Sequence, residues 1–333
     1  MGFRMTEWWS KRRLRLCLLV FMIAVLAFCT IFPILRYPKR AASCQSHDTA
    51  SLATCLLNQQ LELQHLTSNG LLQNVQVTQL RGVWALSLHS VYADSNRILV
   101  VLVLDGPGFH IPSLGIVRLS DMAGRDYTPI TLYQSSDDRR IAGAYVFDAR
   151  SLPGSPAQQD FLLNIDATSV PLRYRHPLIP AAAGRSTIGP WGMRFSLAPL
   201  AGRTIAIGQT AIPTGSTSQP ITLDRIVITP SEVRAYVRFA FAPTYSSLTD
   251  QNWYLNATLI GSQAVQPQHS TYQANLGDGT RIIGFARTSP TLPENYQLTI
   301  AEATRAEGAT PRREIITGPW SFPFVVPPEE STR

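Results

Sequence analysis

Motifs that mark catalytic or metal-binding sites are missing from this sequence. The six histidines are scattered, with no His-x-x-x-His pair and no spacing typical of metal ligands. There is no Gly-x-Ser-x-Gly elbow, no Gly-x-x-x-x-Gly-Lys phosphate loop and no Gly-x-Gly-x-x-Gly dinucleotide motif. We therefore expect no enzyme activity, no cofactor and no metal, and we assign no catalytic residue. A catalytic site assembled from distant loops, for example near Ala201 and Gly202, would leave no such motif and stays open.

Excess charge is also absent from most of the chain, although the net charge is +7. Residues 1–40 hold eight basic residues and one acidic residue, whereas the remainder holds 21 of each sign. Cations beside a membrane span interact with anionic headgroups, and no excess is left to form a phosphate-binding surface. We therefore expect a lipid bilayer as a partner and no binding to nucleic acid.

The first of the features that are present is a run of twenty residues, Leu16 to Leu35, without a charged side chain. A helix of this length spans about 30 Å, the thickness of the hydrocarbon core of a bilayer. Five basic residues precede the run and three follow it, a weak bias that favours a cytoplasmic N-terminus. We expect a single-pass plasma-membrane protein whose C-terminal domains are extracytoplasmic.

Two alternatives to an uncleaved anchor remain open. Ala41 and Ser43 stand at the small-residue positions of a signal-peptide cleavage site, although the apolar run is longer than usual and basic residues intervene. A lipoprotein needs a small residue before its cysteine, but Phe28 precedes Cys29. The uncleaved anchor agrees best with these features.

A spacer with two cysteines follows the predicted span. Cys44 and Cys55 are eleven residues apart and could form a disulfide in an oxidising compartment, although free thiols or an intermolecular pair stay possible. Residues 48–66 predict a short helix that Asp48 caps. Its leucines recur at helical spacing, so that this helix could pack on the next domain or pair with another chain.

From Leu71 onward, short β-rich runs alternate with turns and no long amphipathic helix occurs. In the first half this pattern predicts eight strands, near Val75 to Leu80, Trp84 to Tyr92, Arg97 to Leu104, Leu114 to Leu119, Tyr127 to Leu132, Ile141 to Phe147, Phe161 to Ile165 and Met193 to Leu197.

The second half repeats the first. LHSVYADSNRILVVLVLDGP from Leu88 matches LDRIVITPSEVRAYVRFAFAP from Leu223, and FLLNI from Phe161 matches YQLTI from Tyr296, both at an offset of 135. Each copy closes with Gly-Pro-Trp. We therefore expect an all-β fold of tandem β-sandwiches. The expected parts are a cytoplasmic tail (1–15), a transmembrane helix (16–35), a spacer with a short helix (36–65), two sandwich domains (66–200 and 203–328) and a disordered tail (329–333).

The repeated tryptophans, Trp191 and Trp320, could stack on a ligand. A tryptophan at the start of the last strand in both copies is explained more simply as a plug at the end of a core. We therefore predict that both are structural core residues.

The stretch WALSLHSVYADSNRILVVLVLDGPG, with AGAYVFD downstream, resembles the exported domain of unknown function in bacterial membrane-bound anti-sigma factors and related envelope proteins. The second copy, with its closing GPWSFPFVVPP, is similar to the immunoglobulin-like domain that often follows it. The resemblance implies immunoglobulin-like sandwiches in the bacterial envelope. The family's cytoplasmic sigma-binding domain, with its His and Cys-x-x-Cys, has no counterpart in the fifteen residues before the predicted span.

Together these features predict a membrane-anchored extracytoplasmic binding or sensing module without catalysis, whose partner is an unknown extracytoplasmic protein or envelope ligand. The alternative is a signalling subunit, related to anti-sigma factors, that acts through a separate cytoplasmic partner.

Overall fold

The computed structural model describes residues 48–106, 114–137, 139–152, 157–166, 168–171, 185–213, 219–239, 253–262, 267–276, 279–287, 295–306 and 313–327. The predicted cytoplasmic tail, transmembrane helix and C-terminal tail lie outside these residues. Within the described part, no helix combines the length and apolar character needed to cross a bilayer.

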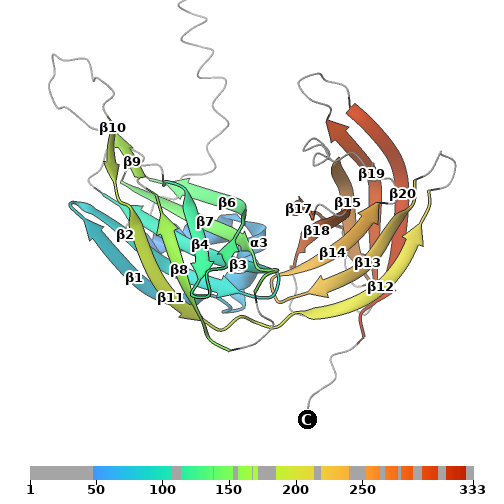
Figure 1. Ribbon diagram of the computed structural model, residues 1–333, viewed down its shortest axis with the longest axis horizontal. Coiled ribbons are helices and arrows are strands. Elements are labelled where there is room, and N and C mark those ends of the chain that lie inside the picture. The colour runs from blue at the N-terminus through green and yellow to red at the C-terminus, as the bar shows by residue number, and fades with distance from the viewer. Residues whose placement is uncertain are drawn as a thin grey trace, which may run out of the picture. The chain divides into compact units, whose positions relative to one another are not determined.

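The described chain consists of two helices followed by antiparallel strands (Figure 1). The helices are α2 (Thr49–Gln59) and α3 (Leu61–Ser68). The strands of the first sandwich are β1 (Gln73–Arg81), β2 (Trp84–Ala93), β3 (Arg97–Asp105), β4 (Val117–Asp121), β5 (Asp126–Tyr127), β6 (Pro129–Ser136), β7 (Arg140–Asp148), β8 (Gln159–Ile165), β9 (Thr168–Pro171), β10 (Arg185–Ile188) and β11 (Trp191–Leu197).

The strands of the second sandwich are β12 (Arg203–Ala211), β13 (Ile221–Ile228), β14 (Glu232–Phe239), β15 (Trp253–Gly261), β16 (Gln268–His269), β17 (Tyr272–Asn275), β18 (Thr280–Ala286), β19 (Asn295–Ala306) and β20 (Arg313–Val325). The chain is therefore a mostly β protein built from several antiparallel sheets, as expected of tandem β-sandwiches.

The two sandwiches have the same strand order. The first pairs a five-stranded sheet, β1-β2-β3-β7-β6, with a four-stranded sheet, β11-β8-β4-β5. The second pairs β12-β13-β14-β18-β17 with β20-β19-β15-β16. Both also carry a bulge at the same place between their second and third strands, at His89 in β2 and Asp224 in β13. The repeated sequence blocks thus fold into strands of the same order and irregularity. The β9–β10 hairpin of the first sandwich was not expected from the sequence.

Each sandwich has its own hydrophobic core. The first core is formed by residues between Leu86 and Leu197, and the second by residues between Ile221 and Val326. Alternate residues of the strands point into these cores, as in β11, where every second side chain from Trp191 is buried.

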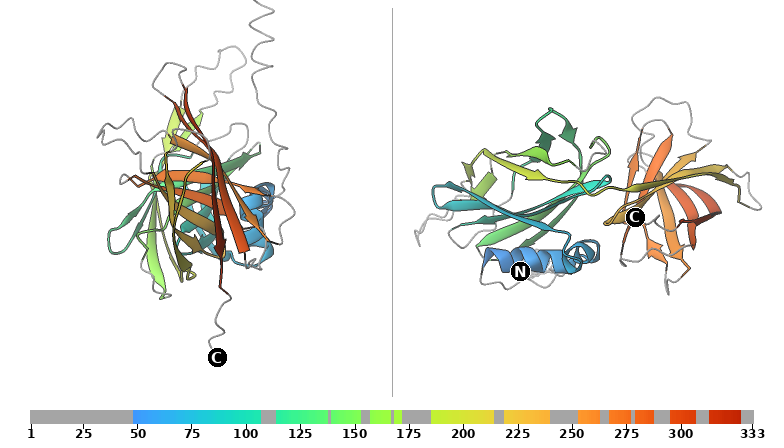
Figure 2. Two further views of the ribbon diagram at one scale, coloured as in Figure 1. Left: turned by 90° about the vertical axis from the view of Figure 1, so that its right-hand side faces the viewer. Right: turned by 90° about the horizontal axis from the view of Figure 1, so that it is seen from below.

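The helical segment packs on the outer face of the first five-stranded sheet (Figure 2). The side chain of Asp48 caps α2, because its Oδ1 accepts a hydrogen bond from the Ser51 amide at 2.6 Å. Helical leucines then contact β3 and β7, which explains why β3 reads as an unbroken apolar run buried on both faces. The single helix expected over 48–66 is wrong in one respect: Gln60 has an extended backbone conformation that separates α2 from α3.

Candidate functional site

The residues singled out in the sequence do not form one site. Trp191 is 1% exposed and lies in the first core, and Trp320 is 0% exposed and lies in the second. The Trp320 indole Nε1 donates to the carbonyl oxygen of Gln219 at 2.9 Å. Cys55 is disulfide-bonded. Its predicted partner, Cys44, lies outside the described residues, so that the pairing stays a prediction.

Asp121 and the residues that follow it form a turn. Asp121 accepts hydrogen bonds from the amides of Ala123 and Arg125, and from the Tyr127 hydroxyl at 3.0 Å. Within the described ranges, no group of three or more histidine, cysteine or acidic side chains is placed to hold a metal ion.

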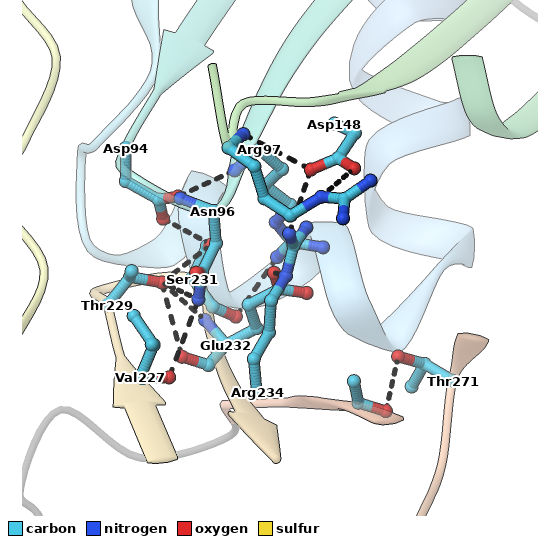
Figure 3. A network of polar contacts seen from close by, with 12 residues as sticks. Asp94, Asn96, Arg97, Asp148, Val227, Thr229, Ser231, Glu232, Arg234 and Thr271 are labelled. Atoms are coloured by element: carbon cyan, nitrogen blue, oxygen red, sulfur yellow. Dashed lines mark hydrogen bonds and ion pairs between the residues drawn. The ribbon is translucent and has the colours of Figure 1, made fainter. Parts of the chain in front are cut away.

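A buried polar network joins the β2–β3 turn of the first sandwich to the β13–β14 turn of the second (Figure 3). The carboxylate of Asp94 shapes its own turn, since its Oδ1 accepts from the amides of Asn96 and Arg97 at 2.8 and 2.9 Å. Its Oδ2 accepts from the hydroxyl of Ser231. Arg97 also reaches across and donates to the Ser231 carbonyl oxygen at 3.0 Å. We call this set, together with Asp148, Glu232 and Arg234, the junction network.

Glu232 and Arg234 are both 0% exposed in the junction network. The guanidinium of Arg234 pairs with the Glu232 carboxyl through Nε and with Asp148 of the first sandwich through Nη1, the latter at 3.0 Å. Desolvation by burial raises the pKa of Glu232, although the nearby Arg234 and Arg97 oppose this effect. Burial of charges on this scale is tolerated only when each has a partner, and the partners here come from both sandwiches.

His65 extends these contacts to the helical segment. Asn69 Nδ2 lies 2.9 Å from His65 Nδ1 and, as an amide donor, leaves Nε2 to carry the ring proton. Nε2 then donates to the Pro230 carbonyl oxygen at 3.1 Å. Desolvation lowers the pKa of His65, with repulsion from Arg287 as a further cause, so that the ring is neutral at pH 7.

A cavity of about 490 Å³ lies beside the junction network. We call it the junction cavity. Its basic side chains are Arg150 and Arg225, and its polar side chains are Ser95, Asn96 and Thr204. The remaining wall consists of Leu152, Val227, Tyr236 and Leu276 together with residues 199–202, which connect the two sandwiches. No acidic residue is among these lining residues.

The wall that the second sandwich contributes is the counterpart of the helix-covered face in the first. Leu99, Val101 and Val103 of β3 contact the helical segment, and at the offset of 135 their counterparts on β14 are Arg234, Tyr236 and Arg238. The aliphatic face of the first copy is therefore replaced by a basic and aromatic face in the second. Sequence reasoning missed this site, and the signal that could have revealed it is the replacement of apolar by charged residues at equivalent positions.

No known protein family matches the sequence, and no curated protein matches it. The fold is similar to that in the crystal structure of a conserved domain protein from Bacillus anthracis, with a TM-score of 0.57 and 8% identity. That match covers 78% of this chain and 92% of the other. Titin Ig tandem domains align with a TM-score of 0.15 and 9% identity over 68% of this chain and 89% of theirs, a score too low to support an inference. The comparisons establish similarity of fold alone.

Proposed function

We propose that this chain is a membrane-anchored extracytoplasmic module that binds a ligand or an envelope protein and catalyses no reaction of its own. We also propose that Leu16 to Leu35 form the anchoring helix and that the sandwiches are immunoglobulin-like. The paired antiparallel sheets with one shared strand order support the second part, in line with the resemblance of the sequence to exported envelope domains.

The disulfide at Cys55 is the observation that carries the extracytoplasmic location. Structural disulfides persist in oxidising compartments and are rare in the cytosol. Cys55 lies in α2, and thirteen residues separate the end of the predicted span at Leu35 from Thr49. Since α2 packs on the first sandwich, a disulfide at Cys55 would place that sandwich in the same oxidising compartment.

A pair of C-terminal reporter fusions tests the location. We expect a fusion to β-lactamase to protect bacterial cells from ampicillin, because that enzyme acts only after export. A fusion to a fluorescent protein that folds only in the cytoplasm should stay dark. Bright fluorescence together with ampicillin sensitivity would reject the proposal.

A second candidate is a signalling subunit that acts through a separate cytoplasmic partner. The resemblance to anti-sigma factors favours it, because these proteins pass a signal across the membrane. The chain would then contact its partner with the short basic tail that contains Lys11 to Arg13. Deletion of residues 2–13 should abolish co-purification of a cytoplasmic protein while the exported part remains folded, and an unchanged set of co-purified proteins would exclude this role.

A further inference from the structure

We infer that the junction cavity binds a small amphipathic anion, a carboxylate with an apolar body, and that Arg225 is its charge partner. The inference deepens the proposed binding function by naming the class of ligand. Two features of the cavity support it: an arginine without an acidic partner, and an apolar and aromatic lining.

The charge of the cavity favours an anion. Arg150 is already paired, since its Nε contacts Asp148 Oδ2 at 2.5 Å. Arg225 is exposed and has no carboxylate partner within the described ranges; its guanidinium carbon lies 4.0 Å from the centroid of the Tyr236 ring. Stacking on the ring holds the cation in place and leaves its N–H donors available to a planar carboxylate.

A second exposed arginine, Arg238 of β14, lies on the same face of this sheet but has an acidic partner. Arg238 donates from Nη2 to Asp224 at 2.7 Å and does not line the cavity. The two exposed arginines of this sheet face therefore differ in whether an acidic side chain neutralises them. Only Arg225 combines an unneutralised charge with a position on the cavity wall.

The rest of the lining suits an apolar body. Leu152, Val227 and Leu276 supply aliphatic surface, and Tyr236 supplies an aromatic face. The volume of about 490 Å³ falls within the range of roughly 300–1,000 Å³ of sites for small molecules. A ligand here would pack its apolar body against these side chains.

The test measures binding of fluorophenylacetate and of its neutral amide to the purified full-length chain in non-ionic detergent, by fluorine NMR. We expect the acid to bind more tightly than the amide. Arg225→Gln should lower the affinity for the acid about tenfold, because it removes a charge-assisted hydrogen bond. The affinity for the amide should stay unchanged. Arg238→Gln is the matched control and should change neither affinity.

A second variant keeps the test independent of the first. Ala201 is an exposed residue of the cavity wall, and Ala201→Trp should fill the cavity and abolish binding of both probes. The inference is overturned if Ala201→Trp or Arg225→Gln leaves the acid affinity unchanged, or if the acid does not bind at concentrations on the order of 10 mM. These measurements on purified protein do not depend on its location, so that failure here is distinct from failure of the reporter fusions.

Discussion

The Asp94 carboxylate accepts a hydrogen bond from the Ser231 hydroxyl, and the two residues occupy equivalent turns of the two copies. In each sandwich, the turn that connects the second and third strands thus also contacts the other sandwich. Since both residues are 0% exposed, their hydrogen bond is shielded from water.

This contact predicts strong energetic coupling. In a double-mutant cycle of Asp94→Ala and Ser231→Ala, we expect a coupling free energy of about 1.5–3 kcal/mol, as for a hydrogen bond to a buried charge. Chemical unfolding of the four purified proteins measures it. The surface pair of Asp224 and Arg238 is the control and should couple by less than about 1 kcal/mol. Equal coupling in the two cycles would contradict the role of the buried turn contact.

Burial of Glu232 predicts a specific dependence of stability on pH. Its pKa in the folded protein is raised by desolvation, so that the folded state keeps its proton at pH values where the unfolded chain has lost it. The free energy of unfolding of the wild type, relative to Glu232→Gln, should be highest below the ordinary carboxyl value of 4.5 and should fall as the pH rises toward the raised value. The charges of Arg234, Arg97 and Asp94 also affect the pKa of this carboxyl, and Tyr272 interacts with it.

Urea unfolding of the wild type and of Glu232→Gln across this pH range shows whether the difference in unfolding free energy falls or grows with pH. This difference in unfolding free energy cannot change by more than about 1.4 kcal/mol per pH unit for a single proton. A difference that grows as the pH rises would mean that attraction to Arg234 outweighs the desolvation of the carboxyl.

Packing of the helical segment predicts a large effect for one buried leucine. Leu56 of α2 is 0% exposed against the first sheet, and Leu56→Ala should lower the free energy of unfolding by about 2–5 kcal/mol through lost contacts and a cavity. Leu80→Ala, at a side chain that is 73% exposed, should change it by less than about 0.5 kcal/mol. Similar values for the two variants would show that α2 does not belong to the first sandwich.

The repeated tryptophans predict an asymmetry between equivalent positions. The Trp320 indole donates to the carbonyl of Gln219, whereas the Trp191 Nε1 is buried without a partner in the described structure. We expect Trp320→Phe to destabilise the chain by roughly 1 kcal/mol more than Trp191→Phe, because only the former breaks a hydrogen bond. Comparison of the two unfolding free energies measures this difference, and a larger loss for Trp191→Phe would contradict it.

Most strands of the first sandwich were predictable because each carries its own local pattern, but β9 and β10 were not expected. The alternation of core-facing and outward-facing residues in β11 and the continuous apolar run in β3 can be seen in the sequence of each strand alone. The cap at Asp48 was likewise predictable, since it links residues three positions apart. Repetition of the sequence blocks in the same order indicated that the order of strands would recur.

The junction network could not be predicted from the same patterns. In EVRAYVRF of β14, charged residues alternate with core residues, and this pattern by itself predicts that Glu232 and Arg234 face solvent. Their burial depends on Asp148, which lies more than eighty positions earlier in the chain. Contacts over such separations are set by how the sandwiches meet, and a local pattern holds no information on them.

The proposed topology is tested most directly by the only two lysines of the chain, Lys11 before the predicted span and Lys39 after it. A membrane-impermeant amine reagent applied to intact spheroplasts, followed by peptide mass spectrometry, reports which of them is outside. We predict modification of Lys39 and protection of Lys11, with both modified once the membrane is dissolved. Modification of Lys11 with protection of Lys39 in intact spheroplasts would contradict it.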